Sequence, residues 1–436
     1  MSVNSIKDSE IWIDRGDEFA RNEDSSKAVE CYTKAIELNP RAAFAYFKRG
    51  NCLADLKLYN EAENDYDNAI VLNNNFSFAF FKRGSAYLEL RQYTAAEADF
   101  SHAIELNENF SFAYHKRGLC RRILKETERA IEDFTKAIEL NESYMQAYLY
   151  RAYCYYELKR IEEAIEDYTR VIELDPRNEK AYISRGIAHG NLQKLEESIS
   201  DYSKAIAINN NSLIAHNYRG LVLSKLRKFE KAIKDFNKVI ELNPNMADAY
   251  NNRGIANYAL KNYEAAIHDY TNALELNHQS PNVYYNRANA NYYAKNFLEA
   301  IIDYESAIDL EPKMLHAYFG LGNSRSGLEQ YREAIKDYSK ALMIDPRFYH
   351  AYIGRGNAFM KLKYYKKALE DFTLAIEIKP ESAQAYMNRA IAFRSEGKND
   401  EAARDFNEFL RLQKTNSAVA NQVRSWLKKN DLPVEY

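Results

Sequence analysis

The stretch FAYFKRG at residues 44–50 returns as FAFFKRG at 78–84 and as FAYHKRG at 112–118, each time after 34 residues. The same spacing, counted from Ser9, divides the chain into twelve segments of 34 residues with no insertion or deletion between them. The segments are 9–42, 43–76, 77–110, 111–144, 145–178, 179–212, 213–246, 247–280, 281–314, 315–348, 349–382 and 383–416. A fixed period of this length indicates one repeat array rather than several unrelated domains.

Each segment carries the same residue types at the same positions, numbered here from its first residue. Position 4 is aromatic in eleven segments, position 8 is always Gly or Ala, position 20 is Ala in all but one, and position 24 is always Tyr or Phe. These positions have the spacing of two amphipathic helices, with small residues where the two backbones approach. Position 31 is usually Asn or Asp, and in six segments a proline follows and ends the second helix. Because one hairpin cannot bury its own apolar face, the hairpins must stack on one another. The sequence therefore predicts an all-α fold, an α-solenoid in which antiparallel helix hairpins form a right-handed superhelix.

This pattern resembles the tetratricopeptide repeat (TPR) family. The aromatic residue at position 4, the small residue at 8, the alanines at 20 and 27, the aromatic at 24 and the proline at 32 match the family signature over residues 9–416. The resemblance implies that the first helices line a concave surface. It also implies that this surface takes an extended peptide or a helix of another protein.

The two ends of the chain lie outside the repeats. Residues 1–8 are expected to form a flexible lead. In 417–436, a stripe of apolar side chains predicts a capping helix over the last repeat, followed by a tail. The stripe consists of Val419, Val423, Trp426 and Leu427.

Two polar columns flank the predicted core. Position 7 is Arg in eleven segments and position 23 is Asp in eleven. An arginine beside a buried seam stays charged and needs a carboxylate partner. We expect each aspartate to pair with an arginine of this column across a seam between helices, preferably that of the next repeat, as in Asp201 with Arg219. Pairing within a repeat, or a surface pair worth about 0–1 kcal/mol, is the alternative. In the first segment Cys31 replaces the aspartate, which leaves one arginine without this partner.

One candidate binding surface is aromatic and basic, and lies at positions 2, 5 and 6 of the second to fourth segments. Large rings beside lysines, on a face that the hairpin core does not need, suit a partner segment with apolar anchors and carboxylates. The alternative is that the rings fill the space between neighbouring first helices. The residues are Phe44, Phe47, Lys48, Phe78, Phe81, Lys82, Phe112, His115 and Lys116.

A second candidate surface is rich in asparagine and tyrosine, in the eighth to eleventh segments. An asparagine side chain both donates and accepts, so a column of them can hold a peptide backbone without reading its sequence. The alternative is that these residues only reflect a chain that is rich in asparagine throughout. The residues are Asn251, Asn252, Tyr258, Tyr285, Asn286, Asn289, Tyr292, Tyr293, Asn323 and Asn357.

Composition and motifs restrict the function. The formal charge of −3 argues against nucleic acid as a partner, no apolar run of 18 residues predicts a membrane span, and four cysteines in 436 residues fit a reducing compartment. No nucleotide-binding glycine motif, metal-ligand spacing or catalytic constellation occurs. We expect a cytoplasmic, non-enzymatic scaffold or adaptor for protein–protein interaction, with no cofactor, metal or small-molecule substrate. The alternatives are a regulatory or effector subunit that sequesters an enzyme or chaperone and, less favoured, a single-stranded nucleic-acid binder.

Overall fold

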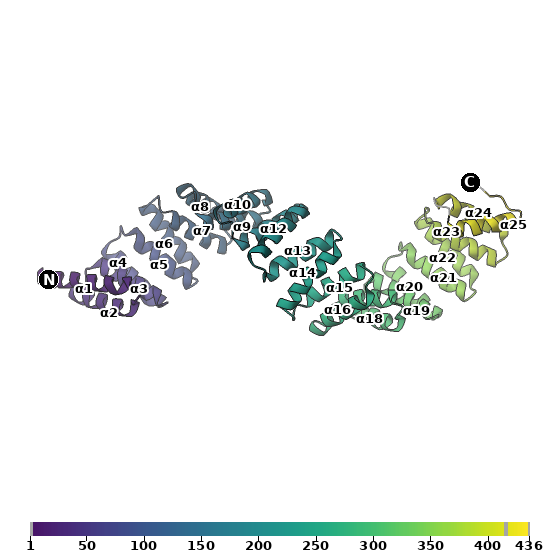
Figure 1. Cartoon of the computed structure of the whole chain (residues 1–436), viewed down its shortest axis with the longest axis horizontal. Coiled ribbons are helices and arrows are strands. Elements are labelled where there is room, and N and C mark those ends of the chain that lie inside the picture. The colour runs from purple at the N-terminus through teal and green to yellow at the C-terminus, as the bar shows by residue number, and fades with distance from the viewer. Residues whose placement is uncertain (1–2, 414–416, 435–436) are drawn as a thin grey trace. The chain divides into compact units, whose positions relative to one another are not determined.

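The computed structural model describes residues 3–413 and 417–434, and within these ranges the chain forms twenty-five helices and no strand (Figure 1). The helices are α1 (Val3–Arg21), α2 (Ser25–Leu38), α3 (Ala43–Asp55), α4 (Tyr59–Leu72), α5 (Ser77–Glu89), α6 (Tyr93–Leu106), α7 (Ser111–Ile123), α8 (Thr127–Leu140), α9 (Met145–Glu157), α10 (Ile161–Leu174), α11 (Glu179–Asn191), α12 (Leu195–Ile208), α13 (Leu213–Lys225), α14 (Phe229–Leu242), α15 (Ala247–Ala259), α16 (Tyr263–Leu276), α17 (Pro281–Tyr293), α18 (Phe297–Leu310), α19 (Leu315–Gly327), α20 (Tyr331–Ile344), α21 (Tyr349–Lys361), α22 (Tyr365–Ile378), α23 (Ala383–Ser395), α24 (Asn399–Leu412) and α25 (Ala418–Lys429).

The chain divides inside α13 into two compact units, Met1–Tyr218 and Arg219–Tyr436. In the N-terminal unit the pairs from α1 with α2 to α11 with α12 are helix hairpins, and each hairpin packs against the next. The C-terminal unit repeats this arrangement from α15 with α16 to α23 with α24. Each unit is therefore an all-α solenoid, as the repeat pattern predicts.

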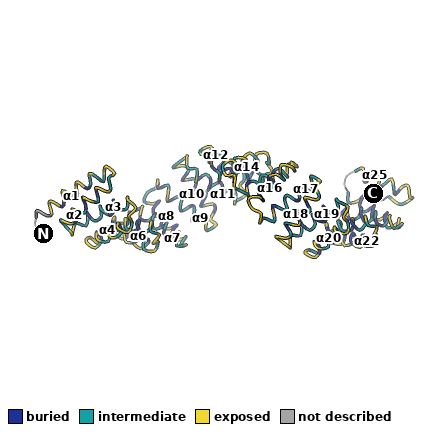
Figure 2. Tube along the Cα trace, turned by 90° about the horizontal axis from the view of Figure 1, so that it is seen from below, coloured by how far each residue is buried: buried dark blue, intermediate teal, exposed yellow. Residues whose placement is uncertain are grey.

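The core of each hairpin lies between its two helices, where buried residues recur along both units (Figure 2). The aromatic ring at position 24 packs over the glycine at position 8. A Cβ atom added to Gly186 would lie 2.8 Å from Cε1 of Tyr202, so a larger residue would push the ring away. The small residue at position 8 thus sets how closely the two helices approach.

The ends of the chain differ in part from expectation. Residues 3–8 belong to α1 and do not form a flexible lead, while residues 1–2 lie outside the described ranges. No glycine or proline precedes Gly16 to stop the helix, and the Ser9 hydroxyl donates a hydrogen bond to the Ala35 carbonyl at 2.8 Å. This bond ties the start of α1 to α2.

At the other end, α25 packs on α24. Val423 and Leu427 are buried, and the Trp426 ring lies 5.1 Å from that of Phe406. Val419, the fourth member of the predicted stripe, is 43% exposed. Residues 414–416, 435 and 436 lie outside the described ranges.

A left-handed residue makes the turn of the hairpins. Position 15 has a positive φ in every segment, and it is glycine only in the last, at Gly397. Lys57, for example, has a φ of 63°. Side chains with a Cβ adopt this conformation at a cost of about 1 kcal/mol, so the turn is imposed by the packing of the two helices.

Replacing Lys57 by glycine should therefore stabilise the protein by up to about 1 kcal/mol, because glycine adopts a positive φ without steric cost. Thermal unfolding followed by circular dichroism measures the gain. Lys57→Ala is the control and should give none. Equal midpoints for the two variants would show that the turn is unstrained.

The arginine and aspartate columns pair within each hairpin. Arg185 donates from Nη2 to Asp201 Oδ1 at 2.7 Å and from Nε to Asp201 Oδ2 at 3.0 Å. The expected pairing of Asp201 with Arg219 is wrong, because Arg219 binds Asp235, also at 2.7 Å. Positions 7 and 23 lie eight residues before and eight after the turn at position 15. An antiparallel hairpin therefore places them opposite each other.

The same arginines also reach the preceding hairpin. Nη1 of Arg151 donates to Thr135 Oγ1 at 3.0 Å, and Nη1 of Arg287 donates to Thr271 Oγ1 at 3.0 Å. Both hydroxyls belong to position 25 of the previous second helix. One guanidinium thus connects three helices, and in most repeats its contact with the preceding hairpin is a hydroxyl, with Asp67 and Asn237 in this place for Arg83 and Arg253.

The two exceptions in these columns behave differently. In the tenth segment Leu321 replaces the arginine, and Arg325 at position 11 donates to Asp337 Oδ2 at 2.6 Å instead. In the first segment Arg15 lies 5.2 Å from the centre of the Trp12 ring and has no ion pair among the described residues. A carboxylate at position 23 thus has an arginine partner even where the column arginine is missing.

Asp167 is 5% exposed, and its carboxylate accepts two hydrogen bonds from Arg151. Replacing Arg151 by methionine should cost about 3–5 kcal/mol, because a buried carboxylate loses its partner. Urea unfolding followed by circular dichroism measures this cost. The double variant Arg151→Met with Asp167→Leu should recover most of it. A single-variant cost below about 1 kcal/mol would place the pair at the surface.

Candidate functional site

In the N-terminal unit, three phenylalanines at position 2 lie on the exposed side of the first helices. Phe44, Phe78 and Phe112 are 54%, 51% and 53% exposed. The rings at position 5, Phe47 and Phe81, are half-buried beneath them. The position-2 rings therefore remain accessible instead of filling the space between neighbouring helices.

A third set of rings completes this surface, and the sequence analysis missed it. Position 34, the last residue of the segment, is Phe76, Phe110 or Tyr144 in these three repeats. The centre of the Phe76 ring lies 6.0 Å from that of Phe44 and 4.7 Å from that of Phe47. Phe110 and Tyr144 hold the same place in the next two repeats. We call these three triads the aromatic strip. The aromatic residues at position 34 were the signal that could have revealed it.

The lysines beside the aromatic strip are not equivalent. Lys48 forms an ion pair with Asp17, and its ammonium lies 4.8 Å from the centre of the Phe44 ring. Lys82 is exposed and Lys116 is half-buried, and neither has an ion pair in the described part of the chain. Lys82 and Lys116 are therefore the cations that this surface offers to a partner.

His115 does not lie on the surface, in contrast to the expectation. Only 5% of it is exposed, and its ring lies 4.9 Å from that of Tyr144 and 5.7 Å from that of Phe134. Neither ring nitrogen has a hydrogen-bond partner among the described residues. Burial, with a smaller contribution from Lys116, lowers the pKa of His115 to about 4. The position-34 ring of its own repeat covers this side chain, so His115 supports the aromatic strip from below.

The contribution of His115 to the stability of the protein should fall as the pH drops from about 6.5 toward 4. Because the folded pKa of His115 lies below the value of about 6.5 in the unfolded chain, the unfolded state binds more protons in this range. The cost between pH 7 and pH 5 should be about 2 kcal/mol. His115→Phe places at position 5 the residue found there in the two preceding repeats, and should remove this contribution. Urea unfolding at both pH values tests it, and an unchanged pH dependence in the variant would contradict it.

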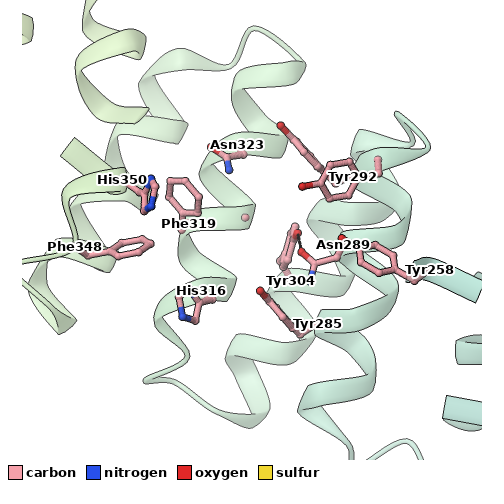
Figure 3. Close-up of a pocket in the computed structure, with 12 residues that line it drawn as sticks. Tyr258, Tyr285, Asn289, Tyr292, Tyr304, His316, Phe319, Asn323, Phe348 and His350 are labelled. Atoms are coloured by element: carbon pink, nitrogen blue, oxygen red, sulfur yellow. Dashed lines mark hydrogen bonds between the residues drawn. The ribbon is translucent and has the colours of Figure 1, made fainter. Parts of the chain in front are cut away.

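The C-terminal unit contains a cavity of about 360 Å³ on the side of its first helices (Figure 3). Tyr285, Asn289 and Tyr292 of α17 and Tyr304 of α18 lie on one side, facing Phe319 and Asn323 of α19 (Figure 3). Rings dominate the lining, and it includes no lysine, arginine or carboxylate. The lining residues are Tyr258, Tyr285, Asn289, Tyr292, Tyr293, Tyr304, His316, Phe319, Gly320, Asn323, Phe348 and His350.

A second cavity, of about 420 Å³, adjoins the first and shares Tyr292 and Asn323 with it. Asn357 of α21 lines it as well. Gly354 also lines this cavity, and a Cβ atom there would lie 2.8 Å from Cε1 of Tyr338. The two cavities form one groove across α17, α19 and α21, which we call the tyrosine–asparagine groove.

The asparagines of this groove are oriented by hydrogen bonds. The Tyr304 hydroxyl donates to Asn289 Oδ1 at 2.6 Å, and the Tyr338 hydroxyl donates to Asn323 Oδ1 at 2.8 Å. Asn357 Oδ1 accepts from Asn388 Nδ2 at 2.8 Å. In each case the side-chain oxygen is occupied, while the amide nitrogen has no partner among the residues that the structure describes.

Burial keeps the two donor tyrosines protonated. It raises the pKa of Tyr338 to about 12, and it also raises that of Tyr304. Their hydroxyls therefore remain hydrogen-bond donors at neutral pH and hold the two asparagine side chains in place.

The structure brings together only part of the second predicted surface. Tyr258, Tyr285, Tyr292, Tyr293, Asn289 and Asn323 line the first cavity, and Asn357 lines the second. Asn251, Asn252 and Asn286 line neither, and Asn286 Nδ2 donates to Asn251 Oδ1 at 3.3 Å. The amide groups of Asn251 and Asn286 thus bond to each other.

The sequence analysis also missed several residues of the groove. His316 and His350 at position 2, Phe319 at position 5 and Phe348 at position 34 occupy the places that the aromatic strip uses in the N-terminal unit. Gly320 was missed because position 6 carries lysine in the earlier repeats. Aromatic residues at positions 2, 5 and 34, the positions that form the aromatic strip, could have revealed these rings.

Comparison with known families identifies the class of protein. Tetratricopeptide repeat models match residues 13–77, 79–110, 113–144, 146–178, 179–212, 214–246, 247–280, 281–314, 316–348 and 349–382. The chain therefore belongs to the tetratricopeptide repeat family. A sequence search of curated proteins gave no match.

The chain also matches several solved structures. YrrB, described as a TPR protein with an unusual peptide-binding site, is 25% identical over 43% of this chain and 96% of its own, with a TM-score of 0.40. Yeast Tom70 is 18% identical over 98% of this chain and 96% of its own, with a TM-score of 0.38. The APC/C Cut9–Hcn1 assembly is 16% identical over 94% of this chain and 88% of that chain, with a TM-score of 0.43.

Two further properties bear on the class of site. No helix in the described ranges is long and apolar enough to cross a membrane. Those ranges also contain no group of three or more His, Cys, Asp or Glu side chains arranged to hold a metal ion.

Proposed function

We propose that this protein is a non-enzymatic scaffold that binds extended segments of partner proteins along its first helices, chiefly in the tyrosine–asparagine groove. Membership of the tetratricopeptide repeat family supports a protein-interaction scaffold in general. The observation that carries the finer proposal is the hydrogen-bonding state that Asn289, Asn323 and Asn357 share. Their side-chain oxygens are occupied within the protein, and their amide nitrogens are free to donate.

Such donors suit a peptide backbone. Every residue of an extended segment presents a carbonyl oxygen, and amide N–H groups on successive first helices can hold several of them without reading side chains. The rings around the donors bury apolar parts of the segment and reduce competition from water. Because several repeats contribute, weak individual contacts add along one bound chain.

The aromatic strip provides a second surface for the same function. Its rings offer apolar pockets at regular intervals, and Lys82 and Lys116 offer cations without a partner in the described part of the chain. A segment with apolar anchors and nearby carboxylates fits this chemistry. The two surfaces lie in different units and differ in charge, so they suit different segments.

Selection of peptides from a random phage-displayed library on the full chain tests the proposal. The affinity of the selected peptides is then measured by fluorescence anisotropy. Asn323→Ala should weaken their binding about tenfold, because one hydrogen bond to the backbone is lost. The matched control is Asn51→Ala, since Asn51 holds the same position in the second repeat and accepts from Tyr66 at 3.0 Å.

Equal affinity of the selected peptides for the wild-type protein and Asn323→Ala would contradict binding in this groove. Failure to select any peptide would contradict the recognition of extended segments. Loss of binding in Asn51→Ala alone would move the site to the N-terminal unit.

A further inference from the structure

We propose that the tyrosine–asparagine groove selects proline-rich segments in the polyproline II conformation. This inference rests on the proposed function and names the class of segment that the groove accepts. It follows from three features of the lining: its hydrogen-bonding groups, its rings and its repeat spacing.

The asparagine amides of the groove are placed to donate hydrogen bonds. The oxygens of Asn289 and Asn323 each accept one hydrogen bond, from Tyr304 and Tyr338, and the N–H groups of both amides have no partner among the described residues. The first cavity offers no carboxylate to receive a backbone N–H. A backbone N–H buried there without a partner would cost about 1–3 kcal/mol. Proline has a carbonyl oxygen but no N–H, so a proline-rich segment satisfies the donors and leaves little unpaired.

The rings of the groove suit proline side chains. Tyr258, Tyr285 and Tyr292 approach from α15 and α17, and Phe319 and Phe348 approach from the opposite side (Figure 3). Grooves lined with aromatic residues are the usual binding sites of proline-rich segments, whose preformed conformation loses little entropy on binding.

The lining of the first cavity also disfavours charged segments, whereas Lys361 lines the second. No lysine, arginine or carboxylate lines the first cavity, so neither an acidic nor a basic side chain would find a charged partner there. Burial lowers the pKa of His350, which favours its neutral form. An uncharged segment is therefore favoured.

The donors recur once per repeat along the groove, and the usual separation of neighbouring helices is close to the polyproline II repeat. Asn289, Asn323 and Asn357 occupy the same position on α17, α19 and α21, and α19 packs against both of the others. Packed helices lie about 8–10 Å apart. A polyproline II helix rises about 9 Å per turn of three residues and presents the same face at each turn. In a β-strand, residues three apart point to opposite faces, so equally spaced donors on one face would not meet equivalent groups.

Fluorescence anisotropy with the full chain tests the inference, using a fluorescein-labelled decaproline and a decapeptide with alanine at every position flanked by the same solubilising residues. We expect decaproline to bind at least tenfold more tightly. Asn323→Asp keeps the acceptor for Tyr338 but removes the N–H donor, and should weaken decaproline binding at least tenfold. Asn51→Asp is the matched control and should leave it unchanged. Circular dichroism confirms that both variants remain helical.

A second variant tests the rings. Tyr285→Ala removes an aromatic wall without touching the hydrogen bonds of Asn289 and Asn323, and should also weaken decaproline binding about tenfold.

Each other outcome has a distinct meaning. Equal binding of the two peptides, both sensitive to Asn323→Asp, would overturn proline selection while the proposed function stands. If decaproline does not bind, while library-selected peptides still bind and are weakened by Asn323→Asp, proline selection is likewise overturned and the proposed function stands. If neither Asn323→Asp nor Tyr285→Ala changes the affinity for decaproline, the assignment of its binding to this groove is overturned.

Discussion

One guanidinium that bridges three helices underlies the architecture of this protein. In ten hairpins an arginine at position 7 binds the aspartate at position 23 of the same hairpin. In most of them the remaining nitrogen of the guanidinium reaches a polar side chain at position 25 of the preceding repeat. The aspartates are buried, and the hydrogen bonds that Arg83 donates to Asp99 raise the pKa of Arg83, so the guanidinium stays charged. Because these hydrogen bonds form only when the three helices have the right relative orientation, the contact defines how one hairpin stacks on the next.

This contact leaves one face of the first helices uncommitted. The core uses positions 4, 8, 20 and 24, and the polar contact uses 7, 23 and 25, so positions 2, 5, 6 and 9 can vary without loss of the fold. The two units use this freedom differently. In three repeats of the N-terminal unit position 6 is lysine beside the aromatic strip, whereas in two repeats of the C-terminal unit position 6 is glycine and lines the groove between tyrosines and asparagines.

Position 9 illustrates how a structural contact becomes part of a binding surface. In several repeats its side chain accepts the hydroxyl proton of the core tyrosine at position 24, as Asp17, Asn51, Asn289 and Asn323 do. An aspartate there presents only oxygen atoms, but an asparagine held in the same way presents an N–H group. The core tyrosine thus determines which end of the asparagine amide faces the groove, and the site gains its direction from the packing.

The repeat length, the helix hairpins, the packing residues and the family could be predicted from the sequence, because a period of 34 residues repeated twelve times leaves one periodic arrangement of apolar side chains. The pairing of the charged columns within a hairpin could also have been derived, since positions 7 and 23 are equidistant from the turn.

Other features depended on the tertiary structure. Position 34 adjoins positions 2 and 5 only because the chain turns back before the next helix, so the aromatic residues at position 34, such as Phe76 and Phe348, could be recognised as a column but not placed on this surface. His115 resembles its neighbours in sequence, yet a ring from the end of its own repeat buries it. The free amide groups of Asn289 and Asn323 became apparent only once their oxygens were seen to be bound. Periodicity reports which face of a helix a residue occupies, whereas exposure and hydrogen-bond direction depend on side chains from other helices.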